Sequence, residues 1–315
     1  MPALLVSSLR PLAGKTTVAV GLAQRLQQDR RPLSLARLAP AEPDEAAQAD
    51  ARCFASLSLS PHAKASPLSL ADAAELTRSL RDTALIMELP AGFPIAEAAR
   101  TLKGPVILVE RFASLNAGDV SSLQRELGAA FAGLVLTAVP RPRLAAIAAT
   151  LAQQALPHLA LLPEDKLLAS PSIAEMAAAL EAQTLYADSR SQEVVEHLTI
   201  APISADPGQD YFLRFGRQAV VVRYNKPDLQ LAALNTASQC LVLTGGQMPL
   251  AYVSERAQAE GVPLLITGKD TVAALQALEE LYFNSRFGGP QKAERISQLV
   301  AEYPDFGGLL KTLSP

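Results

Sequence analysis

Along most of the chain, short runs of consecutive apolar residues alternate with longer segments in which apolar residues recur every three or four positions. The short runs indicate β-strands buried on both faces, and the longer segments indicate amphipathic helices. Strands and helices that alternate in this way favour parallel sheets covered by helices. The chain is therefore predicted to be an α/β protein. In its first part, the predicted strands cover residues 3–7, 32–38, 83–89, 105–110, 132–137 and 158–162.

A second, shorter alternation follows near the C-terminus. Its predicted strands cover residues 218–223, 240–243 and 262–267, and its helices cover residues 227–234, 250–261, 271–282 and 290–303. The segment between the two alternations contains Pro and Ser and breaks the rhythm. We therefore predict a first domain at residues 1–187 that closes with a helix at 172–180. A linker at 188–210, which contains one strand at 194–200, leads to a smaller α/β domain at 211–315 that ends with a helix.

The first predicted strand leads through a turn-rich loop into Gly14-Lys15-Thr16-Thr17, where a helix begins. Such a loop can hold nucleotide phosphates, because backbone N–H groups and the positive end of the helix dipole face the ligand. The ammonium of Lys15 would reach the outer phosphates. The glycine that usually opens this kind of loop is replaced by Ser8 or Leu9, and an ordinary strand–turn–helix is the alternative. The predicted nucleotide contacts are Ser8, Arg10, Ala13, Gly14, Lys15, Thr16 and Thr17.

Thr16, Asp50 and Glu88 are the candidate ligands of a Mg²⁺ ion that would accompany the nucleotide. Mg²⁺ prefers a few protein oxygens together with waters and phosphate oxygens. Glu88 closes an apolar strand, where a lone carboxylate is costly to bury without a partner. Asp50 lies in a predicted loop that is rich in acidic residues. The alternatives are a solvated strand-end acid for Glu88 and a plain surface acid for Asp50.

Composition narrows the classes of function. Of the 315 residues, 49% are apolar and 19% are charged, which is typical of globular proteins. The net charge of −3 and the lack of a basic cluster argue against a nucleic-acid partner. Cys53 and Cys240 have no metal-ligand spacing and suggest no disulfide framework, so we expect a reducing cytoplasm. No signal peptide and no membrane-spanning run is recognised. The histidines are scattered and receive no chemical role: His62, His158 and His197.

Several motifs of the first domain resemble the dethiobiotin synthetase branch of P-loop proteins, which includes the cobyrinic acid amide synthetases. They are Gly14-Lys15-Thr16-Thr17, Ser34-Leu35-Ala36-Arg37, Ala49-Asp50-Ala51 and the strand end Met87-Glu88-Leu89-Pro90. The second domain resembles a DRTGG domain through residues 225–234 and Leu243-Thr244-Gly245-Gly246. The two domains in this order resemble the N-terminal regulatory half of long phosphate acetyltransferases. The resemblance implies a P-loop NTPase-like parallel sheet, followed by a smaller α/β DRTGG-like domain.

The chain also departs from the pattern of these families. Dethiobiotin synthetases have Thr-Asp-Thr in the loop where this chain has Leu9-Arg10-Pro11. Arg37 stands at the position of their substrate-side lysine, and Thr137 at that of their adenine-reading asparagine. In the second domain, Asn225-Lys226 replaces the Asp-Arg that names the DRTGG family. The resemblance therefore implies retained nucleotide binding without dethiobiotin synthesis, and we assign no catalytic residue.

The sequence thus predicts a cytoplasmic regulatory or sensor protein. It would bind ATP or another nucleotide with Mg²⁺ on the first domain, and a small-molecule effector near Thr244-Gly245-Gly246 on the second. Related domains associate in pairs, so a homodimer is expected. One alternative is an ATP-dependent ligase or synthetase that activates a carboxylate or carbamate through Lys15, Thr16, Asp50 and Glu88. Another is a scaffold that binds nothing and contributes an interface.

Overall fold

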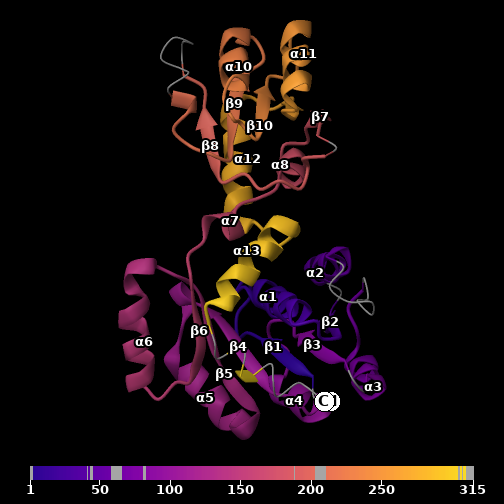
Figure 1. The fold of residues 1–315 in the computed structure, drawn as a ribbon, viewed down its shortest axis with the longest axis vertical. Helices are drawn as coiled ribbons and strands as arrows, with labels where there is room; N and C mark the ends of the chain where they lie inside the picture. Colours follow the sequence, from indigo (N-terminus) through magenta and orange to yellow (C-terminus); the bar gives the residue numbers. More distant parts are fainter. Residues whose placement is uncertain are drawn as a thin grey trace. The chain divides into compact units, whose positions relative to one another are not determined.

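The computed structural model describes residues 3–40, 42, 45–57, 66–80, 83–187, 189–202, 211–303, 306 and 308–309. The chain divides into two compact α/β units (Figure 1). Unit 1 comprises Met1–Asp165 together with Lys292–Pro315, and unit 2 comprises Lys166–Gln291. The α/β class predicted from the alternating apolar pattern is confirmed. None of the helices in the described part of the chain has the length and apolar character needed to span a bilayer.

The sheet of unit 1 has six strands among the described residues, and every neighbouring pair is parallel. Each predicted strand of the first part of the chain is present, because each apolar run is buried on both sides. The strands are β1 (Leu4–Ser7), β2 (Leu33–Arg37), β3 (Ala84–Glu88), β4 (Val106–Arg111), β5 (Phe131–Val139) and β6 (His158–Pro163).

The helices of unit 1 follow the strands in the order that the sequence indicates. They are α1 (Lys15–Gln28), α2 (Glu45–Ser56), α3 (Leu70–Ser79), α4 (Ile95–Leu102), α5 (Ala117–Leu127) and α6 (Leu144–Gln153), with α13 (Pro290–Ala301) near the C-terminus. Three short 3₁₀ helices are η1 (Phe112–Ser114), η2 (Gly128–Ala130) and η3 (Arg141–Arg143). Buried side chains from α3, α4, α5 and α6 form one core cluster with one face of the sheet.

The strand order of unit 1 is β2-β3-β1-β4-β5-β6. From β1 the chain builds the β2–β3 side of the sheet, and then it crosses to β4 on the other side of β1. The carboxyl end of β1 therefore lies where the direction of the chain reverses. Open α/β sheets bind ligands in the crevice outside the strand ends at such a point. The loop at residues 8–14 leaves β1 at this place.

Helix α13 lies against α1 within unit 1, and Figure 1 shows the two helices side by side. A Cβ atom on Gly21 of α1 would lie 2.8 Å from side-chain atoms of both Ile296 and Val300. The absence of a side chain at Gly21 thus permits this close approach. Tyr303, just after α13, donates a hydrogen bond to the carbonyl of Leu161 at β6. The C-terminal segment is part of the packing of unit 1.

Unit 2 contains a five-stranded sheet of order β7-β11-β10-β9-β8 among the described residues. Strand β7 runs antiparallel to β11, and the other neighbouring pairs are parallel. The strands are β7 (Gln183–Leu185), β8 (His197–Ile200), β9 (Gln218–Arg223), β10 (Cys240–Thr244) and β11 (Leu264–Thr267). The helices are α7 (Lys166–Ala169), α8 (Ile173–Ala179), α10 (Pro227–Leu234), α11 (Ala251–Glu260) and α12 (Thr271–Asn284).

Three elements belong to a different unit from the one expected. The helix expected to close the first domain is α8, and its buried Met176 packs with Ala274 and Leu278 of α12 in unit 2. The strand expected inside the linker is β8, which pairs with β9 at the edge of the second sheet. The final helix joins unit 1 from Lys292 onward. An apolar stripe shows that a helix is buried, but it does not show which sheet buries it.

Candidate functional site

The loop after β1 approaches α1 through a residue with left-handed backbone geometry. Gly14 caps α1 with φ +91°, and a Cβ atom there would lie 3.2 Å from the Cγ2 atom of Thr137. Glycine suits this position for both reasons. The backbone N–H groups of the first turn of α1 have no partner inside the helix and point out of its N-terminus. Ala13 is buried before the cap, and Thr17 is half-buried in the first turn.

Lys15 lies folded back against the start of the loop. Its ammonium donates a hydrogen bond of 2.8 Å to the hydroxyl of Ser8, and both side chains are buried. Burial lowers the pKa of Lys15 below its usual value, and the nearby carboxylate of Glu88 opposes this change. The Ser8 hydroxyl donates in turn to the carbonyl of Arg10. The lysine and the loop therefore hold each other in place.

The three residues predicted to ligate Mg²⁺ lie together, but Arg37 lies among them. The hydroxyl of Thr16 donates to Oε1 of Glu88 at 3.2 Å. Nη1 of Arg37 donates to the same Oε1 atom, and it lies 3.2 Å from Oδ2 of Asp50. Arg37 and Glu88 face each other because they are register partners at the ends of β2 and β3. Asp50, expected in a loop, lies in α2, which begins in the acidic segment.

Burial dominates the electrostatics of Glu88. It raises the pKa of this carboxyl group to about 7, while Arg37 opposes the increase. Within the described residues, Oε2 of Glu88 and Nε of Arg37 are buried without a hydrogen-bond partner. Arg37 cannot lose its own charge at any ordinary pH. Arg37 and Glu88 thus form a buried ion pair in which one donor atom and one acceptor atom have no hydrogen-bond partner among the described residues.

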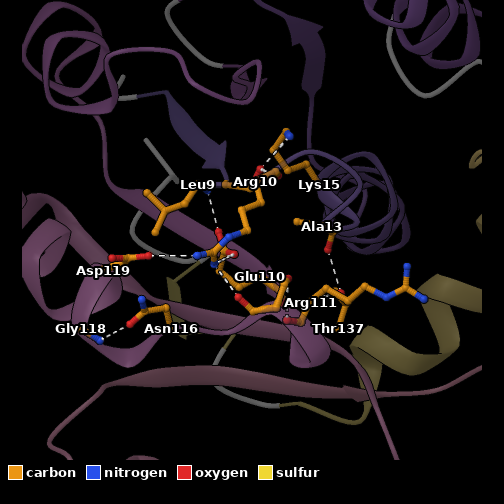
Figure 2. Close-up of polar contacts among 12 residues, drawn as sticks. Leu9, Arg10, Ala13, Lys15, Glu110, Arg111, Asn116, Gly118, Asp119 and Thr137 are labelled. Carbon is orange, nitrogen blue, oxygen red and sulfur yellow. Dashed lines mark hydrogen bonds and ion pairs between the residues drawn. The ribbon is translucent and has the colours of Figure 1, made fainter.

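A second acid, Glu110 at the end of β4, holds the other side of the loop (Figure 2). Its Oε1 atom accepts a hydrogen bond of 2.6 Å from the N–H of Leu9, and its Oε2 atom lies 3.9 Å from Nη1 of Arg10. Arg10 also donates to Asp119 of α5 at 3.1 Å and to the carbonyl of Ser114. Burial raises the pKa of Glu110 above its usual value. The predicted phosphate contact Arg10 is therefore held by acceptors on the β4–α5 side.

Thr137 of β5 completes the loop's surroundings (Figure 2). Its hydroxyl donates a hydrogen bond of 2.8 Å to the carbonyl of Ala13. The sequence indicates no loop-binding role for Thr137 or Glu110. The sequence did contain an indication of a role for Glu110, because this acid closes an apolar strand in the same way as the candidate ligand Glu88 does. The contact between Thr137 and the loop spans 124 positions and has no local signature.

The candidate Mg²⁺ ligands do not fit that ion in this arrangement. Mg²⁺ requires near-octahedral oxygen coordination at about 2.0–2.1 Å. Here, the guanidinium of Arg37 contacts both of the carboxylates that would provide those oxygens. Across the described ranges, no group of three or more His, Cys, Asp or Glu side chains is arranged to hold a metal ion. His62, which received no chemical role, lies outside the described residues.

In unit 2, the predicted effector loop follows β10 at the carboxyl end of the sheet. Gly245 and Gly246 have φ values of +99° and +72°, and a Cβ atom on Gly245 would lie 2.6 Å from the ring of Tyr224. The N–H of Gly245 donates to the carbonyl of Lys269, and that of Gly246 to the carbonyl of Thr267. These two N–H groups are engaged inside the loop, so the glycines serve the turn and the close packing.

Side chains around the same loop are also paired with each other. The hydroxyls of Thr244 and Thr271 lie 3.0 Å apart. Gln230, buried on α10, donates to the carbonyls of Arg223 and Tyr224 at the end of β9. The carboxyl ends of the parallel strands β9, β10 and β11 therefore meet in one bonded network. This edge is where a ligand of an open α/β sheet would bind.

The fold and the loops together define an α/β protein with two sheet units, each with a candidate ligand site at its carboxyl edge. Residues 175–281 match the family model of the DRTGG domain, so unit 2 contains a DRTGG domain. The match includes most of α8, in agreement with its packing in unit 2. The DRTGG resemblance of the sequence is thereby confirmed.

One solved structure similar to part of the chain is a crystal structure from Clostridium perfringens. It contains the CBS and DRTGG domains of the regulatory region of a pyrophosphatase, complexed with the activator diadenosine tetraphosphate. The sequence identity is 13%, and the match covers 58% of this chain and 76% of that chain, with a TM-score of 0.33. This score is too low to establish a common fold, so the DRTGG assignment depends on the family match.

Proposed function

We propose that the protein is a nucleotide-responsive regulatory protein whose unit 1 binds the phosphates of ATP or a similar nucleotide at the loop 8–14 and the first turn of α1. The observation that carries this proposal is the buried ammonium of Lys15 at the N-terminus of a 14-residue helix. Among the described residues, its hydrogen bond goes to the neutral Ser8 hydroxyl. A phosphate oxygen is a stronger acceptor for an ammonium than a hydroxyl is.

The position of the loop supports the same ligand class. The loop leaves β1 at the reversal point of the sheet, and the N–H groups in the first turn of α1, which have no acceptor inside the helix, lie there. A helix N-terminus of this kind favours anions through its dipole and its N–H groups. Lys15 adds a full positive charge to these partial charges. A polyphosphate chain is the ligand that uses all three features together.

The DRTGG domain supports the regulatory part of the proposal. We propose that it takes a small-molecule effector at the edge formed by the ends of β9, β10 and β11. The similarity of the domain order to the regulatory half of long phosphate acetyltransferases suggests a metabolic enzyme of that class as the partner. A nucleotide bound to unit 1 and an effector bound to unit 2 would then be thermodynamically linked, because each would change the stability of the complex with the partner enzyme.

Calorimetric titration of the full chain with ATP tests the proposal. We expect saturable heat for the wild type and, for Lys15→Met, a dissociation constant weaker by about tenfold to a hundredfold, since charge-assisted bonds are strong. Lys103→Met, at an exposed position just after α4, is the matched control and is expected to bind as the wild type does. Absence of binding up to about 1 mM nucleotide, or unchanged affinity in Lys15→Met, would contradict the proposal.

A further inference from the structure

Arg37 is a charged side chain that the proposed phosphate contacts do not use. It lies at the end of β2, with only 6% of its side chain exposed. One of its nitrogens, Nη1, contacts a carboxylate oxygen from β3 and one from α2. The hydroxyl of Thr16, in the first turn of α1, donates to the same Glu88 oxygen. The guanidinium is therefore positioned among the three oxygen-bearing side chains beside the helix N-terminus.

The charges of this cluster are balanced without a metal ion. In their ionised forms, Lys15 and Arg37 supply two positive charges, and Asp50 and Glu88 supply two negative charges. A divalent cation placed among these oxygens would be repelled by a guanidinium that cannot become neutral. It would also have to replace the hydrogen bonds that Glu88 accepts from Thr16 and Arg37. Both effects oppose metal binding here.

The guanidinium also has a donor that no protein group uses within the described chain. Nε of Arg37 is buried and has no hydrogen-bond partner. Buried donors are almost always satisfied in native proteins, so an unsatisfied one calls for a ligand or water. Guanidinium donors match phosphate oxygens in geometry, and they bind phosphate without a bridging ion.

We propose that Arg37 acts as a resident cation in place of Mg²⁺, so that unit 1 binds its nucleotide as the magnesium-free polyphosphate. This inference depends on the proposed function, because it specifies the form of the nucleotide that the loop takes. Lys15 and Arg37 together neutralise the outer phosphates, and Asp50 and Glu88 hold Arg37 in position.

The first experiment measures ATP affinity of the wild-type full chain by calorimetry, with excess Mg²⁺ and with EDTA. The apparent dissociation constant is expected to be about tenfold or more weaker with excess Mg²⁺ than with EDTA, because Mg²⁺ removes the free ATP that the loop takes. Equal affinity in the two conditions, or tighter binding with Mg²⁺, would overturn the inference while leaving the proposed function intact. In EDTA, Arg37→Gln is expected to weaken binding by about tenfold or more. The matched control, Arg25→Gln, removes an exposed arginine near the end of α1 that pairs with Asp29.

A second experiment needs no nucleotide, and it therefore separates failure of this inference from failure of the proposed function. Mn²⁺ is titrated into the protein and followed by electron paramagnetic resonance. The wild type is expected to bind no Mn²⁺ at the cluster. Arg37→Ala is expected to gain one Mn²⁺ site, and adding Glu88→Gln is expected to remove it. A wild-type site that Glu88→Gln abolishes, or no gained site in a folded Arg37→Ala protein, would overturn the inference.

Discussion

At the scale of single residues, the charges of the candidate site are paired inside the protein. Arg37 lies between Asp50 and Glu88, and Arg10 lies between Asp119 and Glu110. Arg37 lies in β2 and Arg10 in the loop after β1, and each arginine pairs with acids from two other elements, so each set of ion pairs links three segments of the chain. The Arg37–Glu88 pair is buried. A buried pair gives little net stability, but breaking it leaves an uncompensated charge. The charged side chains of the site are thus held in place by ion pairs within the protein before a ligand binds.

The raised pKa of Glu88 has a defined effect on stability. Its carboxyl group has a pKa of about 7 in the folded protein, against a usual value of 4.5. Between these values the folded state binds more protons than the unfolded state, so its contribution to the free energy of unfolding falls as pH rises. We expect Glu88→Gln to remove this part of the pH dependence. Urea unfolding of both proteins at pH 4.5 and pH 7.5 measures it.

The control for this prediction is Glu97→Gln, which changes an exposed acid in the first turn of α4. It is expected to keep the wild-type slope of unfolding free energy against pH. The prediction concerns the slope and not the absolute stability, because Glu88→Gln also removes an ion pair with Arg37. Equal slopes for the wild type and Glu88→Gln would show that Glu88 ionises normally in the folded state.

At the scale of elements, the sequence predicts the strands well because burial on both faces requires continuous apolar runs. All six strands of the first sheet and the strands at 218–223, 240–243 and 262–267 are found. Helix α2 is not predicted at Asp50, because Ala and acidic residues without a clear apolar stripe also suit a loop. Strand β8 and helix α8 are recognised as elements, but the sheet to which each belongs depends on contacts that are distant in sequence.

Only those residues of the candidate site that are adjacent in sequence could be predicted from the sequence. Gly14, Lys15 and Thr16 are adjacent in sequence, and their roles follow from position at a helix start. The contacts of Glu110 and Thr137 with the loop link residues about a hundred positions apart, and no spacing rule reports them. The role of Arg37 was not predictable either, since its two acids come from β3 and α2.

The packing of α1 on α13 gives a prediction about helix contact. A methyl group on Gly21 would lie 2.8 Å from side-chain atoms of Ile296 and Val300, which is closer than carbon atoms normally approach. We expect Gly21→Ala to destabilise the protein by about 1–3 kcal/mol through overpacking. Ile296→Ala and Val300→Ala in the same chain remove the two atoms that the methyl group would meet, Cγ1 of Ile296 and Cγ2 of Val300, and are expected to recover part of the loss. Urea unfolding of the single and combined variants measures this coupling, and strict additivity would contradict the contact.

At the scale of the whole molecule, unit 2 is an insertion within unit 1. The chain completes β6, passes through unit 2, and returns to unit 1 at Lys292. The two connections fall at Asp165–Lys166 and inside α13, so both ends of unit 2 are tied to unit 1. The chain thus enters and leaves unit 2 through unit 1, and the second of these connections lies in the helix that packs on α1.

The homodimer expected from the sequence stays a prediction, and unit 2 offers a surface for it. Met248, Leu250 and Tyr252 are about half exposed in and beside the first turn of α11. Exposed apolar side chains that cluster in this way often mark an interface. We expect light scattering to give twice the mass of one chain, and Leu250→Lys to shift the equilibrium toward monomer. A monomeric wild type, or an unaffected Leu250→Lys dimer, would exclude this surface.

The return of α13 to α1 also affects how the protein forms during synthesis. A chain emerging from the ribosome exposes the apolar surface around Gly21 until residues 292–303 have been made. The whole of the DRTGG domain is translated during that interval. The first unit to begin synthesis is therefore the last to complete its packing, and this apolar surface stays uncovered by α13 until then.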